Sequence, residues 1–186
     1  MSDDILELTP VQMDALREIG NVGAGNSATA LSQIINHRID MNVPQVSIVP
    51  LGDVPDLVGG PDVMVVGVFL RVYGAAPGNI LFLLPAESAF YLVDMLMGKK
   101  HGETKNLDFM DESALMEIGN ILAGAYLNAL FNLTKLSLLP SIPALAVDMA
   151  GAILSVVLIQ LGQMGDHALV IETEFTTDQE GIKGHF

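Results

Sequence analysis

The chain has 186 residues, 51% of them hydrophobic, with no cysteine and a formal net charge of −14. Such a length allows one domain with a real core, or two small halves that share one. The missing cysteine excludes disulfides, cysteine-based zinc sites and thiol catalysis, and it fits a cytoplasmic protein. Only eight Lys and Arg stand against 22 Asp and Glu, which argues against nucleic acid or an anionic membrane as a partner.

The first predicted element is a long helix that begins at Thr9. Thr9 can cap the helix, Pro10 suits the first helical position, and Gln12 completes a capping box. The helix is expected to end at about residue 36. Segments rich in β-formers follow, and then a shorter apolar segment that ends at a glycine. The sequence therefore predicts strands at 39–50, 62–73 and 77–84 and a helix at about 86–98.

The second half repeats this order. Asp108 is a good N-cap, and it predicts a second long helix over roughly 109–132. The apolar run 138–162 is the best candidate for a membrane span, but two prolines and an aspartate interrupt it, so we interpret it as buried strands. The predicted strands are about 142–149, 152–161 and 167–176. Short connections favour antiparallel pairing.

A short motif occurs twice, 99 residues apart. Residues 14–31 and 113–130 are identical at 10 of 18 positions, and the same offset carries Pro44 onto Pro143. We therefore expect residues 1–186 to form a single α/β (α+β) domain of two repeats, at about 9–98 and 108–186. Two long helices would pack on a mainly antiparallel sheet, with one shorter helix. The second repeat reaches Gly184 where the first begins its last strand. Either the sequence is truncated at this point or the protein lacks that strand and the helix behind it.

The repeated helix places a polar stripe on one face. Residues at i, i+4, i+7 and i+11 lie along one line of a helix. Glutamate and asparagine three apart are neighbours on this line, and the glycine beyond them leaves space for another molecule to approach the asparagine. The stripe residues are Asp14, Glu18, Asn21 and Gly25 in the first copy and Ser113, Glu117, Asn120 and Gly124 in the second.

A plain solvated helix face is the alternative interpretation. Asparagine is a poor choice for such a face, because its side chain competes with the backbone. A carboxamide can hold a water by donating and accepting hydrogen bonds, and a carboxylate can pair with a cation. The repeated pair therefore indicates groups that enter the active site of a partner, one ordering water and the other gripping a Lys or Arg.

Two other functional classes are disfavoured. Residues 23–28 match a GxGxxA dinucleotide pattern, but that pattern needs a preceding strand and a helix that opens at it. Here it lies in the middle of a capped helix. The four histidines, at 37, 101, 167 and 185, share no metal-ligand spacing. We therefore expect no metal site and no cofactor of the chain's own.

The doubled motif resembles the signature of the CheC/CheX/FliY family of chemotaxis phosphatases. That signature is Glu-x-x-Asn, with Asp or Ser four residues earlier and Pro 23 residues after the Asn. Both copies fit it, and possession of two copies is more similar to the CheC members than to the CheX members. The residues that carry the resemblance are Asp14, Glu18, Asn21, Pro44, Ser113, Glu117, Asn120 and Pro143.

The resemblance implies a pseudo-twofold domain that hydrolyses the aspartyl phosphate of the response regulator CheY. In that case Asn21 and Asn120 would position the attacking water, and Glu18 and Glu117 would pair with the active-site lysine of the receiver. The Mg²⁺ would belong to the receiver. The deamidase CheD is a second implied partner. The alternative is an adaptor that binds CheD and phosphorylated CheY with weak catalysis or none.

Overall fold

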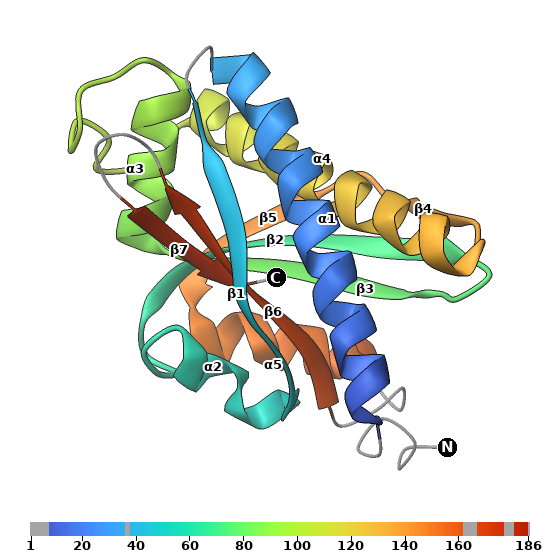
Figure 1. Ribbon diagram of the computed structural model, residues 1–186. Coiled ribbons are helices and arrows are strands. Elements are labelled where there is room, and N and C mark those ends of the chain that lie inside the picture. The colour runs from blue at the N-terminus through green and yellow to red at the C-terminus, as the bar shows by residue number, and fades with distance from the viewer. Residues whose placement is uncertain (1–7, 36–37, 162–166, 177–180, 186) are drawn as a thin grey trace.

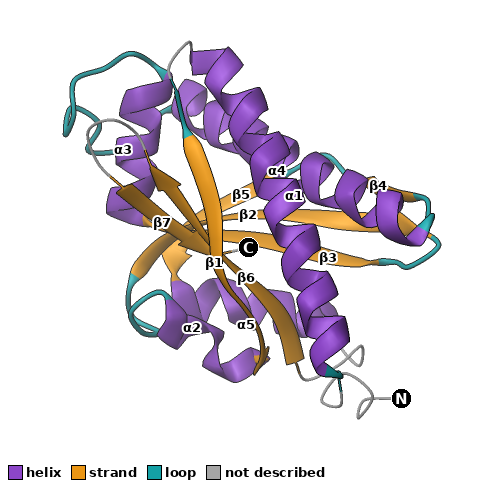
Figure 2. Cartoon of the chain, in the orientation of Figure 1, coloured by secondary structure: helices purple, strands orange, loops and turns teal. Residues whose placement is uncertain are grey.

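The computed structural model describes residues 8–35, 38–161, 167–176 and 181–185 (Figure 1). The chain contains both helices and strands (Figure 2). The helices are α1 Pro10–Ile35, the 3-10 turn η1 Leu51–Asp53, α2 Val54–Leu57, α3 Ala86–Leu96, α4 Phe109–Thr134 and α5 Ala150–Leu161, and α3 and α4 follow one another directly. The strands are β1 Asp40–Pro50, β2 Met64–Gly74, β3 Gly78–Pro85, β4 Leu138–Pro140, β5 Ala144–Met149, β6 His167–Thr176 and β7 Gly181–His185.

Both long helices begin where the sequence predicts. The Thr9 backbone N–H donates to Gln12 Oε1 at 2.8 Å, and the Gln12 N–H donates to Thr9 Oγ1 at 3.4 Å. In α4 the Asp108 carboxylate accepts from the N–H groups of Met110 and Asp111, and the Asp111 side chain accepts from the Asp108 N–H. Each capping box satisfies backbone donors that would otherwise lack a helical partner.

The strands form one sheet in the order β1-β6-β7-β3-β2-β4, and β5 also pairs with β2. Every pairing is antiparallel, as the short connections predict. The order is symmetric about its centre: β1, β6 and β7 of one side correspond to β4 with β5, β2 and β3 of the other. This is the arrangement expected of a duplicated α+β domain.

The two repeated prolines interrupt the outer strands of this sheet. The register of β1 against β6 shifts between Asn42 and Gln45, which places Pro44 in a bulge. The equivalent segment of the second repeat is split into β4 and β5, and Pro143 lies in the break. Proline has no N–H to give to a ladder and is tolerated at such positions.

Two sequence-based predictions about the second half are wrong. Residues 152–161 form helix α5 instead of a strand. Its buried positions are spaced by three and four residues, which is the helical period. Because the segment is apolar throughout, its sequence pattern does not distinguish a helix from a buried strand. The expected loss of the last strand is also wrong, because β7 pairs with β6 and contacts β3. The buried positions of α5 are Ala150, Ile153, Leu154 and Val157.

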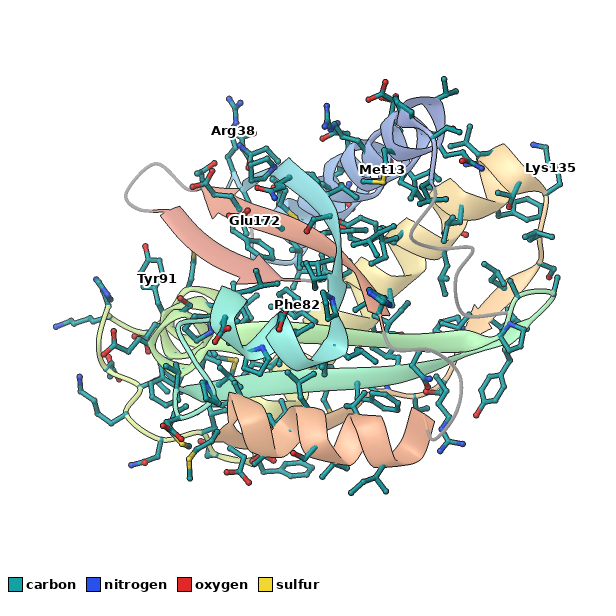
Figure 3. The ribbon with its side chains drawn as sticks, turned by 90° about the horizontal axis from the view of Figure 1, so that it is seen from below. Met13, Arg38, Phe82, Tyr91, Lys135 and Glu172 are labelled. Atoms are coloured by element: carbon teal, nitrogen blue, oxygen red, sulfur yellow. The ribbon has the colours of Figure 1, made fainter. Side chains whose placement is uncertain are left out.

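The long helices cover one face of the sheet, and α2 and α5 lie against the other (Figures 1 and 3). Of the described helices, α4 alone is long and apolar enough to cross a membrane. Its apolar face packs into the main core instead, beside α1 and the sheet. Ile34, near the end of α1, is 57% exposed.

The loop between α3 and α4 is held by a buried carboxylate. Asp94 accepts hydrogen bonds from the backbone N–H groups of Gly102, Glu103 and Thr104 at 2.7–3.2 Å. Lys99 Nζ lies 2.6 Å from Asp111 Oδ1, so the same loop ties α3 to the first turn of α4. Burial acts to raise the pKa of Asp94, but the hydrogen bonds from Thr104, Gly102 and Glu103 outweigh it and hold that pKa below 3.8.

Asp94→Asn should therefore destabilise the protein in a pH-dependent way. A lowered pKa in the folded state means that the carboxylate stabilises the fold above pH 3.8 and that this contribution is lost as the pH falls below it. We expect the free energy of unfolding at pH 7 to fall by about 1–3 kcal/mol, with a smaller deficit at pH 3. Urea unfolding at both values measures this, with the exposed Asp53→Asn as control. An equal deficit at both pH values would contradict the role of the charge.

Candidate functional site

The glutamate and the asparagine of the predicted polar stripe are exposed on both long helices. Glu18 and Asn21, called the α1 pair below, are exposed on α1. Glu117 and Asn120, the α4 pair, are exposed on α4. The opposite faces of the two helices are buried, with Ile19 and Ile118 in equivalent positions. The helical period thus separates the core from the polar pairs as predicted.

The glycines of the two helix faces have different surroundings. A β-carbon on Gly119 would lie 2.6 Å from Val68 Cγ1 of β2, and one on Gly20 would lie 3.3 Å from Val43 Cγ1 of β1. These two glycines let the helices approach the sheet. Gly25 and Gly124 have nothing within 4 Å of such a carbon. The open space predicted beside each asparagine is therefore present.

The residues that precede the two glutamates differ in their contacts. Asp14 is exposed, and its Oδ1 lies 4.0 Å from Arg17 Nη1. Ser113 is half-buried, and its hydroxyl donates to the Phe109 carbonyl at 2.8 Å. The α1 pair therefore has the charged Asp14 and Arg17 beside it, whereas the hydroxyl of Ser113 beside the α4 pair is hydrogen-bonded to the backbone of α4.

The two pairs are not brought together into one site. The helices cross where Gly23 of α1 meets the ring of Tyr126 of α4, because a β-carbon on Gly23 would lie 2.5 Å from Tyr126 Cδ1. Each pair lies on the N-terminal side of this crossing in its own helix, and the helices run in roughly opposite directions (Figures 1 and 3). The pairs therefore lie on opposite sides of the crossing, as two separate sites.

Neither pair lines the apolar cavity of this domain. A largely apolar cavity of about 570 Å³ lies between the two halves of the sheet and beneath the long helices. Its walls include Leu16 and Ile19 of α1 and Tyr126 of α4, but none of the four glutamate and asparagine residues. Small substrates usually bind in such concave sites. Exposed polar groups on a convex helix face suit insertion into a partner instead.

Nothing in the described part of the chain gathers three or more potential metal ligands. Of the four histidines, His101 stacks edge-on against Tyr91 with ring centroids 4.5 Å apart, and His167 begins β6. His37 lies outside the described residues. The chemistry available at the two pairs is therefore that of a carboxylate and a carboxamide.

Two features of the second site were not predicted from the sequence. The first turn of α4 presents an exposed Phe109 and Met110, and Asp111 beneath them is ion-paired with Lys99. Phe109 lies four residues before Ser113, on the same face of the helix, so its exposure could have been predicted from the helical period. The ion pair between Lys99 and Asp111 joins the two ends of the loop between α3 and α4. The conformation of that loop cannot be predicted from a local sequence pattern.

A model of the CheC-like family matches residues 11–48 and 110–146, which hold the two long helices with their exposed pairs and the two prolines. A Bacillus subtilis (strain 168) protein, CheY-P phosphatase CheC, is 44% identical over 178 residues, which cover 94% of this chain and 85% of that protein. The chain belongs to the CheC-like family.

Other CheC-like and flagellar proteins share the fold at lower identity. The crystal structure of Thermotoga maritima FliY superimposes with a TM-score of 0.79 at 24% identity, over 96% of this chain and 90% of that one. The FliM middle domain from H. pylori gives a TM-score of 0.70 at 12% identity, over 96% and 91% of the two chains. At these identities the likeness concerns the fold alone.

Proposed function

We propose that this CheC-like protein hydrolyses the aspartyl phosphate of a CheY-type response regulator. The observation that carries the proposal is the exposure of the same glutamate and asparagine on both long helices, each beside an open glycine. The name of the B. subtilis relative supports the substrate. A cytoplasmic location follows from such a substrate.

Each asparagine would position the attacking water. Its carboxamide can accept one hydrogen bond from a water and donate another, which fixes the water in direction as well as distance. In-line attack on phosphorus needs this alignment, and fixing the geometry of a nucleophile is worth a large rate factor. Asn21 and Asn120 project from rigid helices, so they can enter a partner's site without rearranging.

Each glutamate would hold the partner in register. Glu18 and Glu117 lie one turn before their asparagines. Neither side-chain carboxylate has a hydrogen-bond or ion-pair partner among the described residues. A carboxylate in this state can pair with the lysine of a receiver's active site. The Mg²⁺ of the reaction would be held by the receiver, so the chain's own residues supply alignment and no metal ligands.

The single-site variants test this function. Purified phosphorylated CheY decays slowly by itself, and the wild-type chain should accelerate that decay. Asn21→Ala and Asn120→Ala should each remove one of two separated sites and leave a measurable part of the activity. The measurement is the loss of labelled phosphate over time at several concentrations of the chain. If neither the wild type nor either variant accelerates the decay, the phosphatase proposal is wrong.

The adaptor hypothesis predicts binding without an accelerated decay. A chain that only holds CheD and phosphorylated CheY would bind both proteins in a sedimentation or calorimetric experiment without changing the decay rate. Binding of CheD is a proposal for this chain that is independent of the two asparagines. Intact Asn21 and Asn120 favour catalysis, because a docking surface alone does not require the carboxamide.

A further inference from the structure

The first turn of α4 carries apolar side chains in line with the α4 pair. Phe109 is 78% exposed and Met110 is 59% exposed. At about 100° per residue, Phe109, Ser113, Glu117 and Asn120 fall within roughly 80° of one another around the helix. Phe109 lies eight residues before Glu117, which is about 12 Å along the axis. The aromatic ring and the polar pair thus belong to one face.

The first copy lacks the aromatic residue of this feature. The position equivalent to Phe109 is Pro10. The half-buried Met116, which directly precedes Glu117, is replaced by the exposed Arg17. Arg17 is near Asp14, so the α1 pair has charged neighbours. Val11, equivalent to Met110, is the apolar residue that the first copy retains on this side.

The turn that carries Phe109 is held in place. Asp108 Oδ1 accepts from the Met110 N–H at 2.8 Å and from the Asp111 N–H at 2.9 Å. The Asp111 carboxylate is 2% exposed, and its Oδ1 lies 2.6 Å from Lys99 Nζ. An aromatic side chain on a fixed backbone loses little entropy on binding, which is a property of good interface anchors.

We propose that Phe109 and Met110 form an apolar anchor through which the α4 pair holds the CheY-type receiver. The α4 site then binds the receiver more tightly and with less dependence on salt than the α1 site. This inference rests on the proposed phosphatase function. The occupant is the receiver because a typical interface of roughly 800 Å² per partner has a radius of about 16 Å. A receiver centred on Glu117 and Asn120 therefore covers Phe109 as well.

Kinetics in single-site backgrounds test the anchor. In Asn21→Ala, where the α4 site alone works, Phe109→Ala should raise KM for phosphorylated CheY about tenfold and leave kcat within about twofold. In Asn120→Ala, where the α1 site alone works, the same change should alter neither constant. Ile159→Ala removes an 80% exposed side chain of α5, on the other face of the sheet, and should have no effect in either background.

Salt provides a second readout of the same difference. Between low and high ionic strength, KM should rise more for Asn120→Ala than for Asn21→Ala, because charge-based contacts are screened and apolar contacts are not. The inference is overturned if Phe109→Ala leaves KM unchanged in the Asn21→Ala background, or changes it equally in both.

Direct binding separates this inference from the proposed function. If Asn21→Ala/Asn120→Ala dephosphorylates as fast as the wild type, the catalytic roles are wrong. The anchor is then judged by calorimetric titration of that double variant with CheY bearing a stable phosphate mimic. A tenfold weaker Kd after Phe109→Ala supports the anchor, and an unchanged Kd refutes it.

Discussion

Replacement of both asparagines, Asn21→Ala/Asn120→Ala, should reduce the acceleration of CheY-P decay by about 100-fold or more. The two pairs lie on opposite sides of the helix crossing, so each single variant leaves one site intact and only the double variant removes both. Alanine cannot donate or accept a hydrogen bond, and a water that is free to move reacts with phosphorus no faster than it does in the receiver alone. The measurement is single-turnover decay at saturating concentrations of the chain.

The double variant should still fold and still bind. Both asparagines are exposed, and neither makes a hydrogen bond with another described residue, so the free energy of unfolding should change by less than about 0.5 kcal/mol. The affinity for phosphorylated CheY should stay within about twofold, because the glutamates remain. A matched control is Asn26→Ala/Asn132→Ala, two exposed carboxamides on the same helices. At about 100° per residue they lie about 140° from Asn21 and about 120° from Asn120 around their helices. An inactive control would point to a general effect of losing carboxamides from these helices.

The long helices and their polar faces were predictable because local rules determine them. Thr9 with Gln12 and Asp108 with Asp111 form capping contacts within four residues, and the 3.6-residue period decides which side chains point outward. The duplication also predicted two copies of one unit, whereas the symmetric order of the strands was learned from the structure. The role of Pro44 and Pro143 in breaking the outer strands became visible only with the sheet register.

Helix α5 was missed because the deciding information is tertiary. Its sequence is rich in Ile, Val and Leu and lacks charge, which suits a buried strand as well as a helix. Ile153 packs against Gly67 of β2, and only that packing shows which period is buried. The exposure of Phe109 was missed for a different reason. Large apolar side chains are usually expected in the core, so the sequence analysis did not consider this residue as part of the surface.

Alanine substitution of four glycines should change stability in opposite directions on the two helix faces. Gly23→Ala and Gly119→Ala place a methyl group 2.5 Å from Tyr126 Cδ1 and 2.6 Å from Val68 Cγ1. Both neighbours are buried, at 2% and 1% exposure, so the helices must move. We expect each change to lower the free energy of unfolding by about 1–3 kcal/mol, as overpacking does in cores. Guanidinium unfolding followed by circular dichroism measures it.

Relief of the contact should restore part of the loss. Val68→Ala by itself leaves a cavity and should also destabilise. Combined with Gly119→Ala, it removes the methyl group that clashes, so the double variant should be more stable than the sum of the two single effects predicts. Strict additivity would contradict the packing role of Gly119.

Gly25→Ala and Gly124→Ala should instead stabilise the protein by about 0.5–1 kcal/mol, because alanine is the better helix former and meets no atom within 4 Å. The same methyl group occupies the space beside Asn21 or Asn120. In the single-site backgrounds we therefore expect slower dephosphorylation from a more stable protein, a trade-off typical of functional sites. If stability rises and the rate is unchanged, these glycines have no part in docking. A gain in stability with a loss of rate would show that glycine at these two positions lowers the stability of the helix but leaves room for the partner.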